Sequence, residues 1–240
     1  MTRTREEKAA DKDTKSKWGG ARPGAGRKRS GKRHDAPHRV RPHLAITNPV
    51  HVVLRVKKDL PRLRRLDTYT AIRRVLTRCL GKDDFRVVHL SIQGTHIHFL
   101  IEATGESALT HGMQSLAIRA ARELNKELGR TGKVFEFRYH ATQIQTSRHA
   151  RHALAYVLNN WRRHREDVVS VRTMRAAIDP YSSGVAFRGW VGSPVYAIPK
   201  GYDPLPVSHA RTWLLTVGWK QHGAIDTFEV PGPIRVAPRW

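Results

Sequence analysis

The sequence predicts an α+β domain of ferredoxin-like character, in which helices cover an antiparallel sheet. Strand-like and helix-like segments alternate between residues 43 and 165, and two of the strand-like segments are separated only by the dipeptide Gln93-Gly94. A connection this short joins antiparallel strands. The chain has 240 residues and 39% hydrophobic content, which is enough for one real core.

The first two elements are a strand and a helix. Residues 43–56 alternate in polarity and become β-branched toward their end, and Pro49 is tolerated at the start of a strand. Residues 67–81 have apolar side chains at helical spacing, with Asp67 as the N-cap candidate and Gly81 as the stop signal.

The remaining elements are a hairpin, a long helix, a strand and a last helix. Residues 85–92 and 95–103 are the two strands of the hairpin. Residues 107–129 have the apolar stripe of a long amphipathic helix, and residues 134–146 (VFEFRYHATQIQT) have the composition of a strand. Residues 147–164 form the last helix, with the serine at its start as the cap.

Charge and composition divide the chain into three parts. Residues 1–42 hold 14 Lys and Arg against 5 Asp and Glu and scarcely any large aliphatic side chains, which predicts a disordered basic arm. Residues 43–165 hold the predicted sheet and helices. Residues 166–240 contain 8 of the 13 prolines and several tryptophans, so we expect an extension that packs on the domain with little regular structure.

The net charge of +24, from 44 Lys and Arg against 20 Asp and Glu, makes nucleic acid the first candidate partner. No apolar run approaches the roughly 20 residues of a membrane helix, and the charged opening segment does not read as a signal peptide. The single cysteine, Cys79, excludes an internal disulfide and a multi-cysteine zinc site. These features predict a cytoplasmic, nucleoid-associated protein without a membrane partner.

The strand at residues 95–103 carries the first candidate site residues. Its period of two places apolar side chains on one face and His96, His98, Leu100 and Glu102 on the other. His96 and His98 are then about 7 Å apart along the strand, a span over which two imidazoles can bind one metal ion. Two histidines at this spacing are common by chance. The inference of a metal site therefore depends on their position in the most apolar strand of the domain.

The last helix supplies the second half of the site. Tyr156 and Asn160 are four residues apart and share one helix face. The Asn160 amide oxygen would complete a His, His, Asn set suited to Mg²⁺ or Mn²⁺, and the phenol of Tyr156 would act as a nucleophile toward phosphate. The alternative for Tyr156 is an ordinary helix residue with a solvated hydroxyl.

Three segments together resemble the single-tyrosine HUH transposases, particularly the REP-associated tyrosine transposases: HIH in a strand before a long helix, the run VFEFRYHA and the helix AYVLNN. The resemblance covers residues 43–165 and implies a central antiparallel sheet. It also implies a metal-dependent endonuclease for single-stranded DNA, often beside a hairpin, that leaves a 5′-phosphotyrosine and a free 3′-hydroxyl.

Matched residue by residue, the resemblance implies that His96 and His98 are metal ligands and that Tyr156 is the nucleophile. Asn160 matches the polar residue one turn later that completes the metal site, where the family often has glutamine. Asn159 is adjacent, and either asparagine could be the third ligand. The relatives include dimers and forms that act alone, so a homodimer stays open.

Cations flank the predicted site on both sides and suit a DNA backbone. The expected DNA-binding residues are Arg138, Tyr139, Arg162 and Arg163, together with Arg27, Lys28 and Arg29 of the arm. Tyr139 fits base stacking better than a second nucleophile.

The sequence thus predicts a DNA-cleaving and strand-joining transposase or a domesticated relative. One alternative is a non-catalytic nucleic-acid-binding protein with a degenerate metal site. The other is a metal-dependent nuclease that uses water in place of tyrosine.

Overall fold

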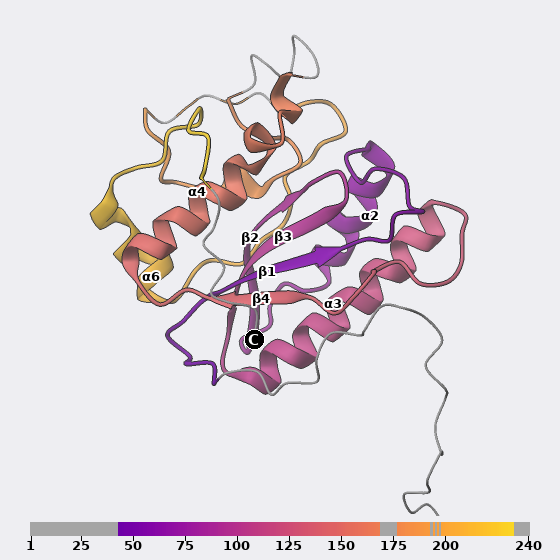
Figure 1. Cartoon of the computed structure of the whole chain (residues 1–240), viewed down its shortest axis with the longest axis horizontal. Helices are drawn as coiled ribbons and strands as arrows, with labels where there is room; N and C mark the ends of the chain where they lie inside the picture. The colour runs from indigo at the N-terminus through magenta and orange to yellow at the C-terminus, as the bar shows by residue number, and fades with distance from the viewer. Residues whose placement is uncertain (1–42, 169–176, 193, 195, 197, 233–240) are drawn as a thin grey trace, which may run out of the picture. The chain divides into compact units, whose positions relative to one another are not determined.

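Four strands form one antiparallel sheet in the computed structural model, which describes residues 43–168, 177–192, 194, 196 and 198–232 (Figure 1). The strands are β1 (Val50–Arg55), β2 (Phe85–Ile92), β3 (His96–Ala103) and β4 (His140–Gln143), and their order across the sheet is β2-β3-β1-β4. With one helix between β1 and β2 and another between β3 and β4, this is the ferredoxin-like α+β architecture that the sequence predicts. The predicted basic arm, residues 1–42, lies outside the described residues.

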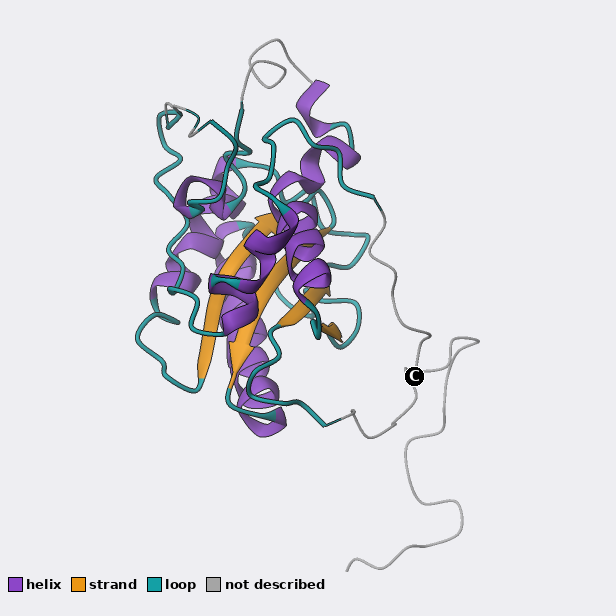
Figure 2. Cartoon of the chain, turned by 90° about the vertical axis from the view of Figure 1, so that its left-hand side faces the viewer, coloured by secondary structure: helices purple, strands orange, loops and turns teal. Residues whose placement is uncertain are grey.

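Helices cover both faces of the sheet, so its strands lie between helical layers (Figure 2). Helices α2 (Leu66–Thr77) and α3 (Glu106–Glu127) pack on one face, and α4 (Ser147–Arg163) packs on the other. No helix in the described part of the chain combines the length and the apolar character needed to cross a membrane.

The alternation of β3 sets which side chains meet which layer. Ile97, Phe99 and Ile101 belong to the hydrophobic core with α2 and α3, whereas Leu100 belongs to the core with α4. The histidines of β3 share the face of Leu100 and therefore point toward α4. This is the two-faced strand predicted from the period of two.

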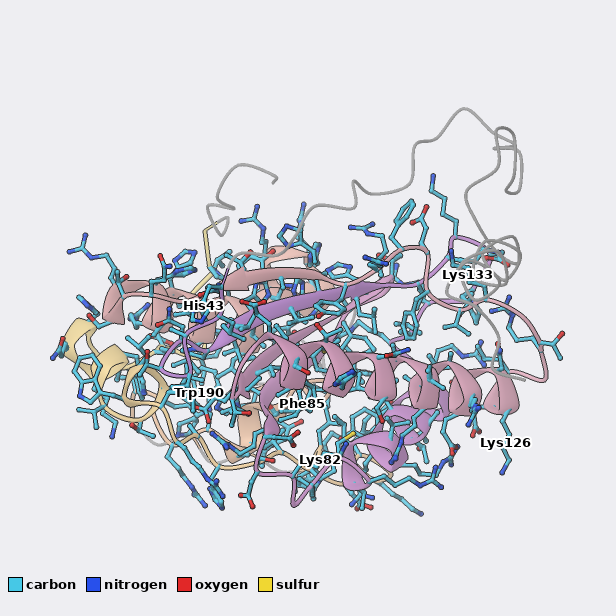
Figure 3. The ribbon with its side chains drawn as sticks, turned by 90° about the horizontal axis from the view of Figure 1, so that it is seen from below. His43, Lys82, Phe85, Lys126, Lys133 and Trp190 are labelled. Carbon is cyan, nitrogen blue, oxygen red and sulfur yellow. The ribbon has the colours of Figure 1, made fainter. Side chains whose placement is uncertain are left out.

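Helix α3 comes unusually close to the sheet at Gly112. A Cβ atom at this position would lie 2.1 Å from Cδ2 of Phe85, the first residue of β2, which Figure 3 labels. Real Cβ contacts are never this short, so the absence of a side chain lets the Phe85 ring pack against the helix backbone. The sequence has a glycine here although glycine disfavours helix interiors.

The segments after α4 form short helical turns in the described part of the chain, of which the second packs against β2 and the others pack against α4. They are η2 (Glu166–Val168), η3 (Ser183–Ala186), α6 (Trp213–Thr216) and η4 (Gly218–His222). Leu214, Trp219 and Ile225 share one hydrophobic cluster with Leu154 and Leu158 of α4. Burial of this apolar area stabilises the helix from the side that the sheet does not cover.

Glu102, at the end of β3, ties α6 to the sheet. Its buried carboxylate accepts hydrogen bonds from the backbone N–H of Arg211 at 2.9 Å and from the N–H and hydroxyl of Thr212 at 2.8 and 2.7 Å. Arg86 pairs with the same carboxylate at 2.7 Å. A buried carboxylate with this many donors is fully satisfied.

The strand predicted over residues 134–146 is shorter in the structure. It pairs with β1 at a bridge between Val56 and Phe135 and again from His140 onward, where His140 lies opposite Val53. Because the chain has five steps between Phe135 and His140 against three on β1, the residues between these pairings bulge out of the ladder.

Two predicted helix caps also differ by position. The N-cap of α2 is Arg65, and Asp67 lies in the first turn, where its carboxylate accepts from the Thr68 N–H at 2.7 Å. The N-cap of α4 is Thr146 instead of Ser147, and its hydroxyl accepts from the His149 N–H at 3.1 Å. No side chain caps the start of α2, whereas at α4 the extended backbone of Thr146 makes this residue the cap.

Candidate metal and nucleophile site

Three histidines from two adjacent strands form a connected row on the α4 side of the sheet. Nε2 of His96 lies 2.9 Å from Nε2 of His98, and Nδ1 of His98 lies 3.0 Å from Nε2 of His51 on β1. The rings of His51 and His98 are stacked, with centroids 5.2 Å apart. Both of these side chains are buried, at 4% and 3% exposure.

Helix α4 lies over this row and brings Tyr156 and His164 to it. The Tyr156 ring stands edge-on to the rings of His98 and His51, with centroids 5.3 and 5.8 Å apart, and the His164 ring lies 5.6 Å from that of His96. Asn160 is one turn after Tyr156 and one turn before His164, so it shares their helix face and is fully buried.

The two adjacent asparagines of α4 have different surroundings. Nδ2 of Asn159 donates to the backbone carbonyl of Asp226 at 2.8 Å. By contrast, both amide atoms of the buried Asn160 have no protein partner in the described part of the chain. A buried amide without a partner is costly, which makes Asn160 the asparagine available to a bound group.

Strand β2 and the residue that follows it add two more unpartnered polar side chains beside the histidines. Ser91 is directly opposite His98 in the ladder, and Gln93 follows two residues later, beside His96, whose carbonyl accepts from the Gln93 N–H at 2.9 Å. The Ser91 hydroxyl and both amide atoms of Gln93 are buried without a hydrogen bond among the residues described. The two imidazoles of β3 therefore lie among polar atoms that a hydrated ion or a phosphate would satisfy.

Burial keeps the histidines of this site neutral. It lowers the pKa of His51 to about 3, with a further lowering from the nearby His140, His149 and His96. Burial also lowers the pKa of His96 to about 4 and that of His98 well below its usual range. A neutral imidazole has a nitrogen lone pair to offer, which is the form that binds metals.

The phenol of Tyr156 is half-buried, and its burial raises its pKa above the usual value of 10, while the charge of Arg163 opposes this shift. Arg55 is exposed at the end of β1, directly opposite His96, and its charge acts on both histidines of β3. The site therefore combines neutral imidazoles, a protonated phenol and two cations at its edge.

The residues present fit a divalent cation. Two ligand atoms that bind one ion at about 2.1 Å and at a right angle lie about 3.0 Å apart, close to the 2.9 Å between the Nε2 atoms of His96 and His98. No group of three His, Cys, Asp or Glu side chains that could hold a metal is found among the described residues. A third ligand must come from another residue type, and Asn160 offers an amide oxygen.

Residues 47–160 match the family model described as "Transposase IS200 like". This segment, just under half of the chain, is similar to the IS200-like transposases. No curated protein matches the chain. A solved structure titled as a REP-associated tyrosine transposase bound to a REP hairpin is similar at 12% identity, covering 53% of this chain and 74% of that chain, with a TM-score of 0.44.

The residues predicted to bind DNA lie in different surroundings in the structure. Arg138 and Arg163 are exposed, and Tyr139 is half-buried against the core. Arg163 also donates to the Pro231 carbonyl at 3.2 Å. Arg27, Lys28 and Arg29 lie outside the described residues.

Arg162, which is also predicted to bind DNA, has a buried side chain. Only 6% of this side chain is exposed, and its guanidinium donates to the Thr227 carbonyl at 2.6 Å and pairs with Asp167 at 3.1 Å. It also stacks on the rings of Trp161 and Phe228. Arg162 thus joins α4 to the segments that follow it, and burial rather than charge decides its role.

The sequence does not predict that His51 and Arg55 lie at the site. The alternation of β1 places both on one face, but nothing in the alternation says that β1 pairs with β3. Their position beside His98 and His96 follows only from the strand order.

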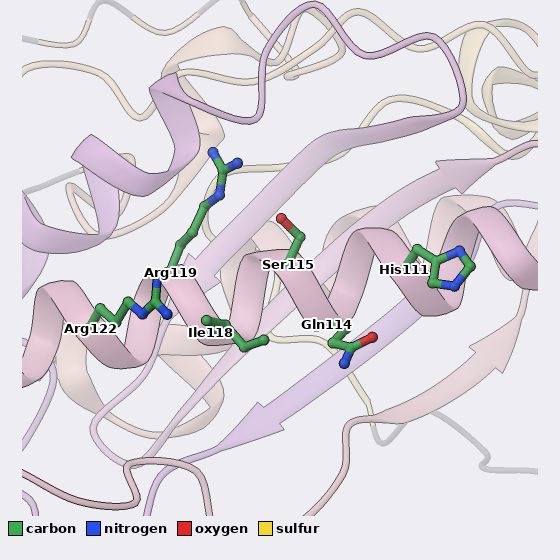
Figure 4. Close-up of a pocket in the computed structure, with 6 residues that line it drawn as sticks. All are labelled: His111, Gln114, Ser115, Ile118, Arg119 and Arg122. Carbon is green, nitrogen blue, oxygen red and sulfur yellow. The ribbon is translucent and has the colours of Figure 1, made fainter.

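The hollow on the outer face of α3 does not belong to this site. It is lined by His111, Gln114, Ser115, Ile118, Arg119 and Arg122 (Figure 4). Because α3 covers the opposite face of the sheet from α4, none of the predicted site residues reaches it.

Proposed function

We propose that the protein is a transposase that cleaves and rejoins single-stranded DNA, at sites flanked by hairpins, with Tyr156 as the nucleophile. The observation that carries the proposal is the edge-on contact of the Tyr156 ring with His98, whose Nε2 converges with that of His96. A phosphate held at the two imidazoles would then be within reach of the phenol.

His96, His98 and Asn160 would hold a divalent cation, Mg²⁺ or Mn²⁺. When bound, the cation would polarise the phosphoryl oxygens and make the phosphorus more open to attack. The neutral state of the buried histidines and the unpartnered amide of Asn160 support this set. The hydrogen bond of Asn159 to Asp226 argues against Asn159 as the third ligand.

In the proposed step, the phenolic oxygen of Tyr156 attacks the phosphorus and forms a tyrosine O–P bond. The bond between phosphorus and the 3′-oxygen breaks, so the DNA 5′ end stays on the protein. The proton that the phenol loses is balanced by the proton that the leaving 3′-oxygen gains. The reverse attack by a 3′-hydroxyl rejoins the strands without an external energy source.

Arg55, Arg138 and Arg163 would bind the phosphates on either side of the scissile bond, with Tyr139 stacking on a base. Arg27, Lys28 and Arg29 would add contacts from the arm. We also propose that residues 43–165 form the catalytic domain and residues 166–240 its packed extension. The protein would act at the nucleoid, as a monomer or a homodimer.

The test uses the full chain and single-stranded hairpin DNA from its own genomic flanks, labelled at the 3′ end, with Mn²⁺ or Mg²⁺. A 5′-phosphotyrosine leaves the label on the protein, so a denaturing gel should show a labelled band at protein mass. Chelator and Tyr156→Phe should both remove this band. Tyr139→Phe is the matched control and should keep it, because its ring can still stack.

Two other outcomes would overturn the tyrosine mechanism. Free cut DNA with a 5′-phosphate, and no band at protein mass, would identify a nuclease that uses water. Intact DNA that still shifts on a native gel, without metal dependence, would identify a binding protein.

A further inference from the structure

We propose that His51 is a positioning residue that fixes the orientation and tautomer of His98, so that Nε2 of His98 faces the bound cation. This inference rests on the proposed function for the metal site. It adds a residue from β1, outside the strand and helix that supply the ligands.

Both ring nitrogens of His98 lie within hydrogen-bonding distance of another histidine. Its Nδ1 lies 3.0 Å from Nε2 of His51, and its Nε2 lies 2.9 Å from Nε2 of His96. A histidine that binds a metal through one ring nitrogen almost always donates the other N–H to a partner that fixes its orientation. His51 is that partner here, and its Nε2 accepts the Nδ1–H of His98.

This hydrogen bond sets the tautomer of His98. With the proton on Nδ1, the lone pair of Nε2 points toward Nε2 of His96, where the two ligands converge. The Thr95 hydroxyl, 3.2 Å from Nδ1 of His96, can occupy the other nitrogen of that ring. His96 and His98 therefore each have a partner for Nδ1, and each presents Nε2 to the metal site.

His51 is itself held rigidly. It lies in β1 between two strands, opposite Leu100 of β3 and Thr142 of β4, and only 4% of it is exposed. The Tyr156 ring packs edge-on against both His51 and His98. A displaced His51 would therefore disturb the ligand and the tyrosine together.

The test compares three variants of the full chain. His51→Leu removes the acceptor, and His51→Gln keeps one, because the Gln Oε1 reaches about as far as the His Nε2. His89→Leu is the matched control, since His89 is a buried histidine of β2 whose Nδ1 pairs with Ser183 instead of the site. Circular dichroism checks that each variant folds.

Two readouts are independent of DNA cleavage. Nitrogen-15 NMR of the metal-free protein should show His98 as the Nδ1–H tautomer in the wild type and in His51→Gln, and a mixture in His51→Leu. Electron paramagnetic resonance of free Mn²⁺ should show binding about 10- to 100-fold weaker in His51→Leu. His51→Gln should recover most of this loss, and His89→Leu should bind like the wild type.

An unchanged His98 tautomer in His51→Leu, or Mn²⁺ binding equal to that of the wild type, would overturn the role of His51. A wild type that binds no Mn²⁺, or binds it equally well after His98→Ala, would instead overturn the proposed metal site. The tautomer measurement contains no metal, so the two failures are distinguishable. If His51→Leu does not fold, equal Mn²⁺ binding by His51→Gln and His51→Asn overturns the proposal, because the shorter Asn cannot reach Nδ1 of His98.

Discussion

At the scale of single residues, adjacent positions on α4 have opposite roles. Asn159 is tied to the Asp226 carbonyl, whereas Asn160 is buried without a protein partner in the part of the chain that the structure describes. The sequence alone cannot choose between them, because neighbouring residues of a helix point about 100° apart and the helix phase is known only to about a residue. By contrast, His96, His98 and Tyr156 could be brought together from periodicity, because each lies on an apolar element with a clear inner face.

Replacing each asparagine by alanine should separate stability from metal binding. Asn159→Ala leaves the Asp226 carbonyl without its donor, so the free energy of unfolding should fall by about 1–3 kcal/mol. Asn160→Ala removes an unpartnered amide and should leave the free energy of unfolding nearly unchanged, but Mn²⁺ binding should weaken. Urea unfolding and Mn²⁺ titration of both variants make the comparison. If Mn²⁺ binding is lost in Asn159→Ala but kept in Asn160→Ala, Asn159 is the metal ligand and Asn160 is not.

At the scale of elements, the hydrophobic periods predicted the strands of the sheet and the helices α2, α3 and α4 that cover it. They did not predict local irregularities in these elements. The bulge between Phe135 and His140 escaped prediction because a run with good strand composition gives no sign that part of it leaves the ladder. The position of His51 beside His98 escaped for a related reason. Side-chain alternation describes one strand, whereas strand order depends on contacts distant in sequence.

The close packing of α3 on β2 predicts an unusual mutational effect. Gly112→Ala should improve the helix propensity of α3, yet we expect it to lower the free energy of unfolding by about 1–3 kcal/mol, because the new Cβ would overlap the Phe85 ring. Thr110→Ala, on the exposed side of the same helix, is the control and should change stability by less than about 0.5 kcal/mol. Thermal and urea unfolding measure both. If Gly112→Ala instead stabilises the protein, the Phe85 ring and β2 can shift away from α3 at little cost in free energy.

At the scale of the whole molecule, buried neutral histidines make stability depend on pH. Burial lowers the pKa of His51 to about 3 and those of His89 and His96 to about 4, against about 6.5 in an unfolded chain. Below pH 6.5 the unfolded chain therefore binds protons that the folded protein does not. The stabilisation is complete above pH 6.5 and is lost as the pH falls toward 4.

Urea unfolding between pH 7.5 and pH 4.5 should show this loss as a falling midpoint. Each such histidine contributes a slope of up to about 1.4 kcal/mol per pH unit, so His89→Leu should have a shallower pH dependence than the wild type, although its stability at pH 7.5 is lower. Without added metal, a midpoint that does not change with pH would contradict the burial of these rings.

The extension that follows α4 was the part least open to prediction. Its composition indicates turns and tryptophans that pack on the domain; Trp190 and Trp219 are buried, whereas Trp213 is exposed, and the contacts that hold the extension are long-range. Arg64, before α2, binds Asp179 through two hydrogen bonds of 2.9 and 2.7 Å. Pairs this distant in sequence leave no periodic signal, so only the fold reveals them.

The outer side of α4 is covered by side chains that lie far downstream, among them Leu214, Trp219 and Ile225. The ribosome makes the tyrosine helix well before it makes these residues. Until Ile225 has emerged, a nascent chain keeps the apolar back of that helix open to solvent and to chaperones. The helix that carries Tyr156 is therefore fully supported only after residues 214–225 have been made and have packed against it.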